Sequence, residues 1–145
     1  MMAMTYGYVY VAQINLGADK NQAVKALKEA EAYHGPSLII CYSPCINHGI
    51  KRGMQHSFLE AKAAVECGYW SCYRYNPVEK AAGKKSFFLD STKTPKFDTF
   101  KDFLKGEVRY ASLAKTFPDV AEELYAKTQQ DAEARLAGYV KLDAE

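Results

Sequence analysis

The fold is decided by residues 8–42, which read YVYVAQINLGADKNQAVKALKEAEAYHGPSLIICY. The aromatic and β-branched run at the start of this stretch favours a β-strand. Asp19 then predicts the cap of a helix, with Gln22 at the position that completes a capping box. The helix is expected to end before Gly35, and a second apolar run follows over residues 37–42. Strand, helix and strand in this order predict a right-handed βαβ unit.

The second strand and the helix of this unit carry further predictions. The second apolar run shows little alternation, which is typical of a strand covered on both faces of a parallel sheet. In the helix, Val24, Leu27 and Ala30 stand at helical spacing and predict a short, alanine-rich inner face. The fold class that follows is α/β, with a parallel sheet and flanking helices.

A further helix and strand are expected after the βαβ unit. Ser57 and Glu60 have the spacing of a capping box, and Gly68 is typical of a helix stop. Residues 69–75 then predict a third strand, because four of these seven residues are aromatic.

The C-terminal half is predicted to be a surface loop followed by helices. Residues 78–96 lack periodicity and predict a long surface excursion, with residues 87–89 as a short buried anchor. A short helix is expected around Phe100, and the last helix is expected to begin at Pro118 and to run to about Tyr139.

The predicted sheet is thin for a complete domain, since sheets average about 5 to 6 strands. Its first strand also begins close to residue 1. The chain is therefore expected to start inside a domain. We predict that residues 1–76 are the C-terminal half of an α/β domain and that residues 77–145 are a C-terminal extension.

Composition excludes several classes of function. The net charge of +2 gives no reason to expect a nucleic-acid or membrane partner. No apolar run approaches the ~20 residues of a membrane span, and the N-terminus lacks the features of a secretory signal. A cytoplasmic, reducing location is expected, where the four cysteines would not form disulfides. The chain has no C-x-x-C pair, so neither a zinc finger nor a thioredoxin-like motif is supported.

The loop of residues 43–53 is the best candidate site. It leaves the second strand at its carboxyl end, where open α/β sheets bind their ligands, and it presents Cys45, Asn47 and His48 within four positions. A plain turn is the alternative interpretation, with the cysteine as a small buried apolar residue. The other cysteines stand on predicted regular elements and are expected to be structural: Cys41, Cys67 and Cys72.

Several motifs, in order along the chain, resemble the thiamine-diphosphate domain of the pyruvate:ferredoxin (flavodoxin) oxidoreductases, also known as pyruvate synthases. They are AMTYGYVYVA (3–12), GADKNQ (17–22), GPSLII (35–40), PCINHG (44–49), GYW (68–70), YRYNP (73–77) and GEVRY (106–110). The resemblance covers essentially the whole chain. It implies a partial thiamine-diphosphate-binding fold that forms the C-terminal piece of such an enzyme.

The resemblance also implies a reaction and its cofactors. The family converts pyruvate and coenzyme A to acetyl-CoA and carbon dioxide, using thiamine diphosphate with Mg²⁺, and passes electrons through [4Fe–4S] clusters to ferredoxin or flavodoxin. Cys45 matches the last ligand of the cluster nearest the thiamine, whose other ligands would lie outside this chain. Asn47 and His48 are expected to orient the loop or to donate hydrogen bonds near that cluster.

The chain also departs from the family pattern. It contains neither the diphosphate motif nor the clustered cysteines of the ferredoxin-like segments, so no catalytic residue and no complete cofactor site are predicted here. The isolated chain is expected to bind no cofactor and to be inactive without the remainder of the oxidoreductase. The alternative hypothesis is a stand-alone protein-interaction module that retains the fold without catalysis.

Overall fold

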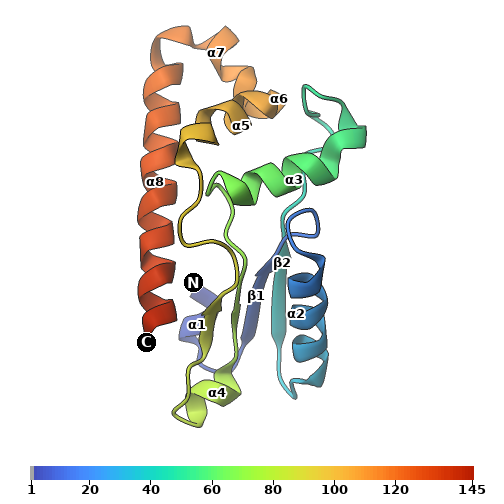
Figure 1. The fold of residues 1–145 in the computed structure, drawn as a ribbon, viewed down its shortest axis with the longest axis vertical. Coiled ribbons are helices and arrows are strands. Elements are labelled where there is room, and N and C mark those ends of the chain that lie inside the picture. Colours follow the sequence, from blue (N-terminus) through green and yellow to red (C-terminus); the bar gives the residue numbers. More distant parts are fainter. Residues whose placement is uncertain (1) are drawn as a thin grey trace.

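A computed structural model describes residues 2–145 as a four-stranded sheet flanked by helices (Figure 1). The strands are β1 (Tyr10–Ile14), β2 (Ser37–Cys41), β3 (Tyr73–Tyr75) and β4 (Phe87–Leu89), in the order β2-β1-β3-β4. The α/β class is confirmed. Parallel pairing is confined to β1 and β2, whereas β3 runs antiparallel to both β1 and β4, so the sheet is mixed rather than wholly parallel.

The predicted βαβ unit is present, with α2 (Lys20–Ala32) as its crossover. The Oδ1 atom of Asp19 accepts hydrogen bonds from the backbone amides of Asn21 and Gln22, at 2.9 and 3.0 Å, and so caps the helix as expected. Gln22 does not complete a capping box. Its Nε2 atom instead donates to the backbone oxygen of Gln13 and to the Asp90 carboxylate.

The inner face of α2 is alanine-rich as predicted, with Ala30 also packed against the core, but two predicted residues do not lie on it. Ala23 and Ala26 are fully buried against the sheet, whereas Val24 and Leu27 remain about half exposed. Small side chains let the helix lie close to the strands, and the larger residues therefore point outward. The strand β2 is likewise less covered than expected, because it forms an edge of the sheet and leaves Leu38 and Ile40 exposed.

The helix α3 (Ser57–Glu66) follows a single turn of 3₁₀ helix, η1 (Met54–His56), and carries a second unexpected feature. Glu60 is buried and does not form the predicted capping box, because the Ser57 hydroxyl bonds backward to Met54. Gly68 does follow the helix with a φ of 84°, as a C-terminal stop requires.

The third strand is shorter than the sequence indicates. Tyr69 and Trp70 leave the ladder to pack against Tyr42, and the Trp70 indole donates to the backbone oxygen of Ile14 at 3.2 Å. The short helix α4 (Pro77–Ala81) then leads into β4, so the buried anchor predicted at residues 87–89 is a strand of the sheet.

The C-terminal part is helical and returns across the sheet. It begins with η2 (Phe97–Thr99), α5 (Phe100–Gly106), α6 (Val108–Ala111) and α7 (Leu113–Thr116). The last helix, α8 (Pro118–Ala144), extends five residues beyond the predicted end and runs along one side of the molecule (Figure 1). Within residues 2–145, no helix combines the length and apolarity needed to cross a membrane.

Candidate functional site

The loop that leaves β2 borders a hollow at the carboxyl ends of the two parallel strands. After β2, the loop runs past α3 in space, and Ile50 near its end pairs with Glu107 at the junction of α5 and α6 (Figure 1). The hollow has a volume of about 200 Å³ and is lined by Leu16, Gly17, Cys41, Tyr42, Ser43, Pro44, Ser57, Phe58 and Ala61. The predicted site therefore lies at the place where open α/β sheets present ligand-binding loops.

Cys45 and His48 are brought together by a tight turn. The Gly49 amide donates to the Cys45 backbone oxygen at 2.8 Å, and Gly49 has a φ of 78°, which favours glycine. The turn places the Cys45 Sγ atom 3.0 Å from the His48 Nδ1 atom. Asn47 is exposed, and its backbone amide rather than its side chain is directed at the sulfur.

These contacts favour the thiolate form of Cys45. The backbone amide of His48 and then its imidazole hydrogen bond to the sulfur, and together they lower the pKa of the Cys45 thiol from 9.0 to about 7. The residue is only half-buried. A partly exposed thiolate is the form of cysteine that binds metals and reacts with electrophiles.

The other three cysteines lie in different surroundings. Cys67 and Cys72 are buried, and burial raises the pKa of these thiols to about 11 and about 12. Both are structural, as expected. Cys41 is exposed on the edge strand, in contrast to the prediction of a covered strand.

Exposed apolar side chains surround the Cys45 loop. Ile46 beside the cysteine is 83% exposed, and Phe58 at the start of α3 is 62% exposed. Leu16, which lines the same hollow, is also exposed. An apolar group of this kind usually marks a surface that another protein segment covers.

A buried polar cluster that sequence reasoning missed lies beneath the loop. Glu107 is fully buried, and its Oε1 atom accepts a hydrogen bond of 2.5 Å from the Tyr42 hydroxyl. Its Oε2 atom lies 3.1 Å from the Arg109 Nε atom, an ion pair whose alignment falls short of a hydrogen bond. Glu107 belongs to the GEVRY motif, but the motif has no local feature that indicates a partner 65 residues away.

The loop cannot hold a metal centre by itself. Within the described residues, no group of three or more cysteine, histidine, aspartate or glutamate side chains is arranged to bind a metal ion. Cys45 and His48 make a pair of such side chains, one fewer than this minimum.

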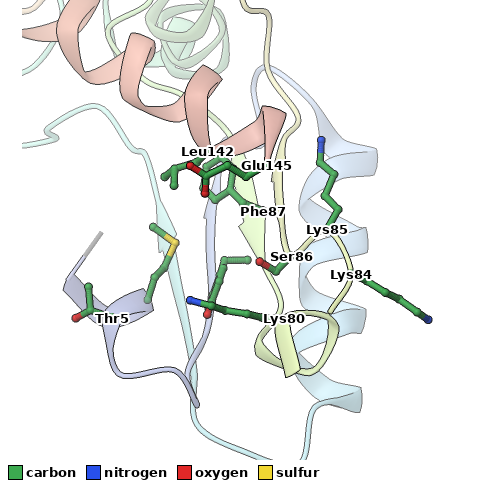
Figure 2. Close-up of a pocket in the computed structure, with 10 residues that line it drawn as sticks. Thr5, Lys80, Lys84, Lys85, Ser86, Phe87, Leu142 and Glu145 are labelled. Atoms are coloured by element: carbon green, nitrogen blue, oxygen red, sulfur yellow. The ribbon is translucent and has the colours of Figure 1, made fainter. Parts of the chain in front are cut away.

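A second cavity, of about 280 Å³, lies far from this loop between α1 (Met2–Thr5), β4 and the end of α8. Figure 2 shows Lys80 extended across it and Lys84 directed away from it. Lys85 is paired with Asp143, and the acidic Glu145 also lines the cavity. The charges offset one another, so this cavity does not present a clear ligand type.

Comparison with known proteins finds several oxidoreductases that are similar to this chain. No family model matches the chain. Over 142 residues it is 61% identical to a pyruvate-flavodoxin oxidoreductase from Enterobacter agglomerans, covering 98% of this chain. It is 56% identical over 145 residues to a pyruvate-flavodoxin oxidoreductase from Klebsiella pneumoniae, and 59% identical over 142 residues to a pyruvate:ferredoxin oxidoreductase from Moorella thermoacetica.

The chain is similar to one segment of these oxidoreductases. The resemblance inferred from the sequence motifs is thus confirmed along nearly the whole chain. The chain spans about 12% of the length of each of these three relatives. The rest of such an enzyme would supply whatever this segment lacks.

Proposed function

We propose that this chain is the part of a pyruvate:flavodoxin or pyruvate:ferredoxin oxidoreductase that supplies Cys45 as one ligand of a [4Fe–4S] cluster. The other ligands would lie in polypeptide outside these 145 residues. The observation that carries the proposal is the position of the Cys45 sulfur, half-buried in a strand-end loop, with hydrogen bonds that lower its pKa to about 7.

The donor set fits a shared cluster better than a self-contained one. [4Fe–4S] clusters are held by cysteine thiolates, and Cys45 is the thiol in the chain whose pKa is lowered toward neutrality. When bound, such a cluster would carry electrons between the reacting centre and an acceptor protein. In this chain, the loop would hold the thiolate. The buried Tyr42–Glu107 pair beneath it would fix the position of the loop.

The surroundings of the loop support a covered metal centre. Hydrophobic surroundings and hydrogen bonds to sulfur tune the reduction potential of such clusters. Ile46 and Phe58 would provide apolar cover once another part of the enzyme packs on them, and the His48 amide would remain a donor to the sulfur.

The thiamine diphosphate, Mg²⁺ and acceptor sites belong to the complete enzyme in this proposal. The sequence lacks the diphosphate motif of the resembled family, and residues 2–145 hold no group of three or more possible metal ligands. In this proposal the conversion of pyruvate and coenzyme A therefore takes place in the complete oxidoreductase. The alternative of a stand-alone interaction module has less support, because the similar proteins bear names of oxidoreductases and contain this segment as a small part of their length.

The proposal is tested by replacing Cys45 with alanine in a complete oxidoreductase that contains this segment. Electron paramagnetic resonance and iron analysis should show the loss or alteration of one cluster, with loss of pyruvate-dependent reduction of flavodoxin. Cys41→Ala, which removes an exposed thiol from the neighbouring strand, is the matched control and should leave the cluster signals unchanged. Unchanged signals in Cys45→Ala would refute the assignment.

A further inference from the structure

Both ends of the loop that carries Cys45 are fixed by the same short segment. At the start of the loop, the Tyr42 hydroxyl donates to the Glu107 carboxylate at 2.5 Å. At its end, the Lys51 amide donates to the Gly106 oxygen at 2.9 Å and the Val108 amide donates to the Gly49 oxygen at 3.2 Å. Glu107 therefore reaches one end through its side chain and borders the other through its backbone.

The first of these attachments is buried. Tyr42 is buried among the rings of Tyr69 and Trp70, with ring centroids 6.0 and 5.6 Å away. Burial and the hydrogen bond to Glu107 raise the pKa of Tyr42, so its hydroxyl stays protonated and remains a donor. Tyr42 lies three residues before Cys45, so this attachment holds the chain at the point where the loop leaves β2.

Glu107 is an unfavourable residue at this place unless its charge has a role. A fully buried carboxylate is expensive to desolvate, and an apolar side chain of similar size often stabilises a core as well or better. Here one carboxylate oxygen has only the imperfectly aligned Arg109 guanidinium beside it. Buried polar groups of this kind can specify one arrangement among several that an apolar core would tolerate.

Close approach of a second acid makes the arrangement more specific. Glu60 is also buried, and a Cβ atom placed on Gly106 would lie 2.7 Å from its Oε1 atom. Burial, and then the nearby Glu107 charge, raise the pKa of Glu60. A side chain at position 106 would therefore have to displace the Glu60 carboxylate.

We propose that Glu107, acting through the Tyr42 hydroxyl, is a positioning residue that holds the Cys45 loop in the arrangement needed for its sulfur to bind a metal centre. This inference rests on the proposed function of Cys45. It assigns a role to the GEVRY motif: the side chain of Glu107 fixes the start of the loop while the adjoining backbone fixes its end.

The first test measures the loop in this chain without any cofactor. Tyr42→Phe removes the hydroxyl and keeps the ring, and hydrogen exchange should become about tenfold faster at the amides of Gly49, Lys51 and Val108. Exchange at Asn76, whose amide bonds to Ser86 at 2.9 Å, should be unchanged because it reports on the sheet. Glu107→Gln keeps an acceptor for Tyr42 and should show a smaller increase.

Matched controls separate this effect from the mere loss of a hydroxyl or a charge. Tyr6→Phe removes an exposed hydroxyl and Glu123→Gln removes an exposed carboxylate, and neither should alter exchange in the loop. Thermal unfolding of all four variants shows first that each is folded.

The second test uses a complete oxidoreductase loaded with its clusters. Tyr42→Phe should alter the electron paramagnetic resonance spectrum of one cluster while the iron content stays the same. Unchanged exchange at the three amides would overturn the inference. Faster exchange with an unchanged spectrum would overturn it too, since the pair would then serve stability alone.

The two proposals fail in different ways. If Cys45→Ala removes a cluster but Tyr42→Phe changes neither exchange nor spectrum, only the positioning role is wrong. If Cys45→Ala leaves every cluster intact, the function proposed for Cys45 is wrong, whatever Tyr42→Phe does to the loop.

Discussion

Cys45 combines two properties that a buried structural cysteine lacks. Its sulfur is reachable from solvent, and amide and imidazole groups of the same turn stabilise its negative charge. Both properties come from contacts within four consecutive residues that Gly49 closes into a turn. The turn therefore lowers the pKa of the Cys45 thiol without any metal centre present.

Thiol labelling of the folded chain checks this account. We expect iodoacetamide to modify Cys45 and Cys41 but not Cys67 or Cys72, which are buried and have a raised pKa. The thiolate is the nucleophile. The rate of modification at Cys45 should therefore rise with pH and reach half its maximum near pH 7, the pKa of the Cys45 thiol. Mass spectrometry of each cysteine peptide measures these rates.

The control for this labelling is His48→Ala. It removes the imidazole but keeps the backbone amide, so the half-maximum should move only part of the way toward 9.0, the ordinary value. A rate at Cys45 no higher than at Cys41 at pH 7 would contradict the description of the turn.

Part of the site could be predicted from the sequence. Cys45 and His48 are close in the chain, and their position after a strand indicates a loop at a sheet edge. Glu107 could not be assigned a role in the same way, because its partner Tyr42 lies 65 residues away and no periodicity connects them. Only the folded arrangement of β2 and the α5–α6 junction brings the pair together.

The turn between β1 and α2 limits how the loop region can pack. A Cβ atom on Gly17 would lie 2.3 Å from the Phe58 backbone oxygen and 2.9 Å from the Ala61 Cβ atom. Both neighbours belong to α3, which lines the hollow beside the Cys45 loop. The absence of a side chain at Gly17 therefore lets α3 lie against the ends of the parallel strands.

Gly17→Ala should consequently destabilise the chain by about 1–3 kcal/mol, the usual cost of overpacking. Urea unfolding followed by circular dichroism measures the change. Gly138→Ala is the control, because a Cβ atom there meets nothing within 4 Å. Gly138 lies inside α8, so alanine should stabilise that variant by up to about 1 kcal/mol. Equal stability of Gly17→Ala and the parent chain would contradict the close approach of α3.

Local signals predicted the elements well and their burial less well. Asp19 and Gly68 mark helix ends through short-range chemistry, and both behave as expected. Val24 and Leu27 were wrongly predicted to lie on the inner face of α2, because they are its more hydrophobic residues. Close packing on the sheet instead buries the smaller alanines. The third strand was overestimated because Tyr69 and Trp70 favour strands locally but pack instead around Tyr42.

The return of α8 along the sheet ties the C-terminal helix to β3 and β4. Tyr139 packs against Tyr73 with ring centroids 5.0 Å apart. Near the end of the helix, the Asp143 carboxylate lies 2.9 Å from the Lys85 Nζ atom and 2.6 Å from the Lys93 Nζ atom, and it accepts a hydrogen bond from the Leu89 amide. One carboxylate thus connects α8 to β4 and to the segment after it.

This connection should depend on pH. Burial would raise the pKa of Asp143, but hydrogen bonds from Lys93, Leu89 and Lys85 outweigh it and lower the pKa from 3.8 to about 2. Because the folded state holds the proton less tightly than the unfolded state, the stabilisation is complete above about pH 4 and is lost as the pH falls toward 2.

Asp143→Asn should therefore lower the free energy of unfolding at pH 7 by about 2 kcal/mol, within the range for hydrogen bonds to charged groups. It should also weaken the loss of stability between pH 4 and pH 2. Urea unfolding across this range makes the measurement, with the exposed Asp131→Asn on the same helix as control. An identical pH dependence in parent and variant would contradict the role of Asp143.

Part of the exposed apolar surface lies on the side opposite α8. The edge strand β2 and the outer face of α2 expose Leu38, Ile40, Val24 and Leu27, and both elements lie across the molecule from α8 (Figure 1). Such a surface is unusual for a protein that acts alone. It agrees with a chain that corresponds to about 12% of the length of its relatives.

The position of the Cys45 sulfur in the assembled enzyme is the most direct evidence that could be obtained. A crystal structure of a complete oxidoreductase containing this segment, with anomalous scattering recorded at the iron edge, would locate every cluster iron. We predict a bond between the Cys45 Sγ atom and one iron, with the loop still held by Tyr42 and Glu107. A cluster with four other protein ligands, and Cys45 still paired with His48 away from any iron, would contradict it.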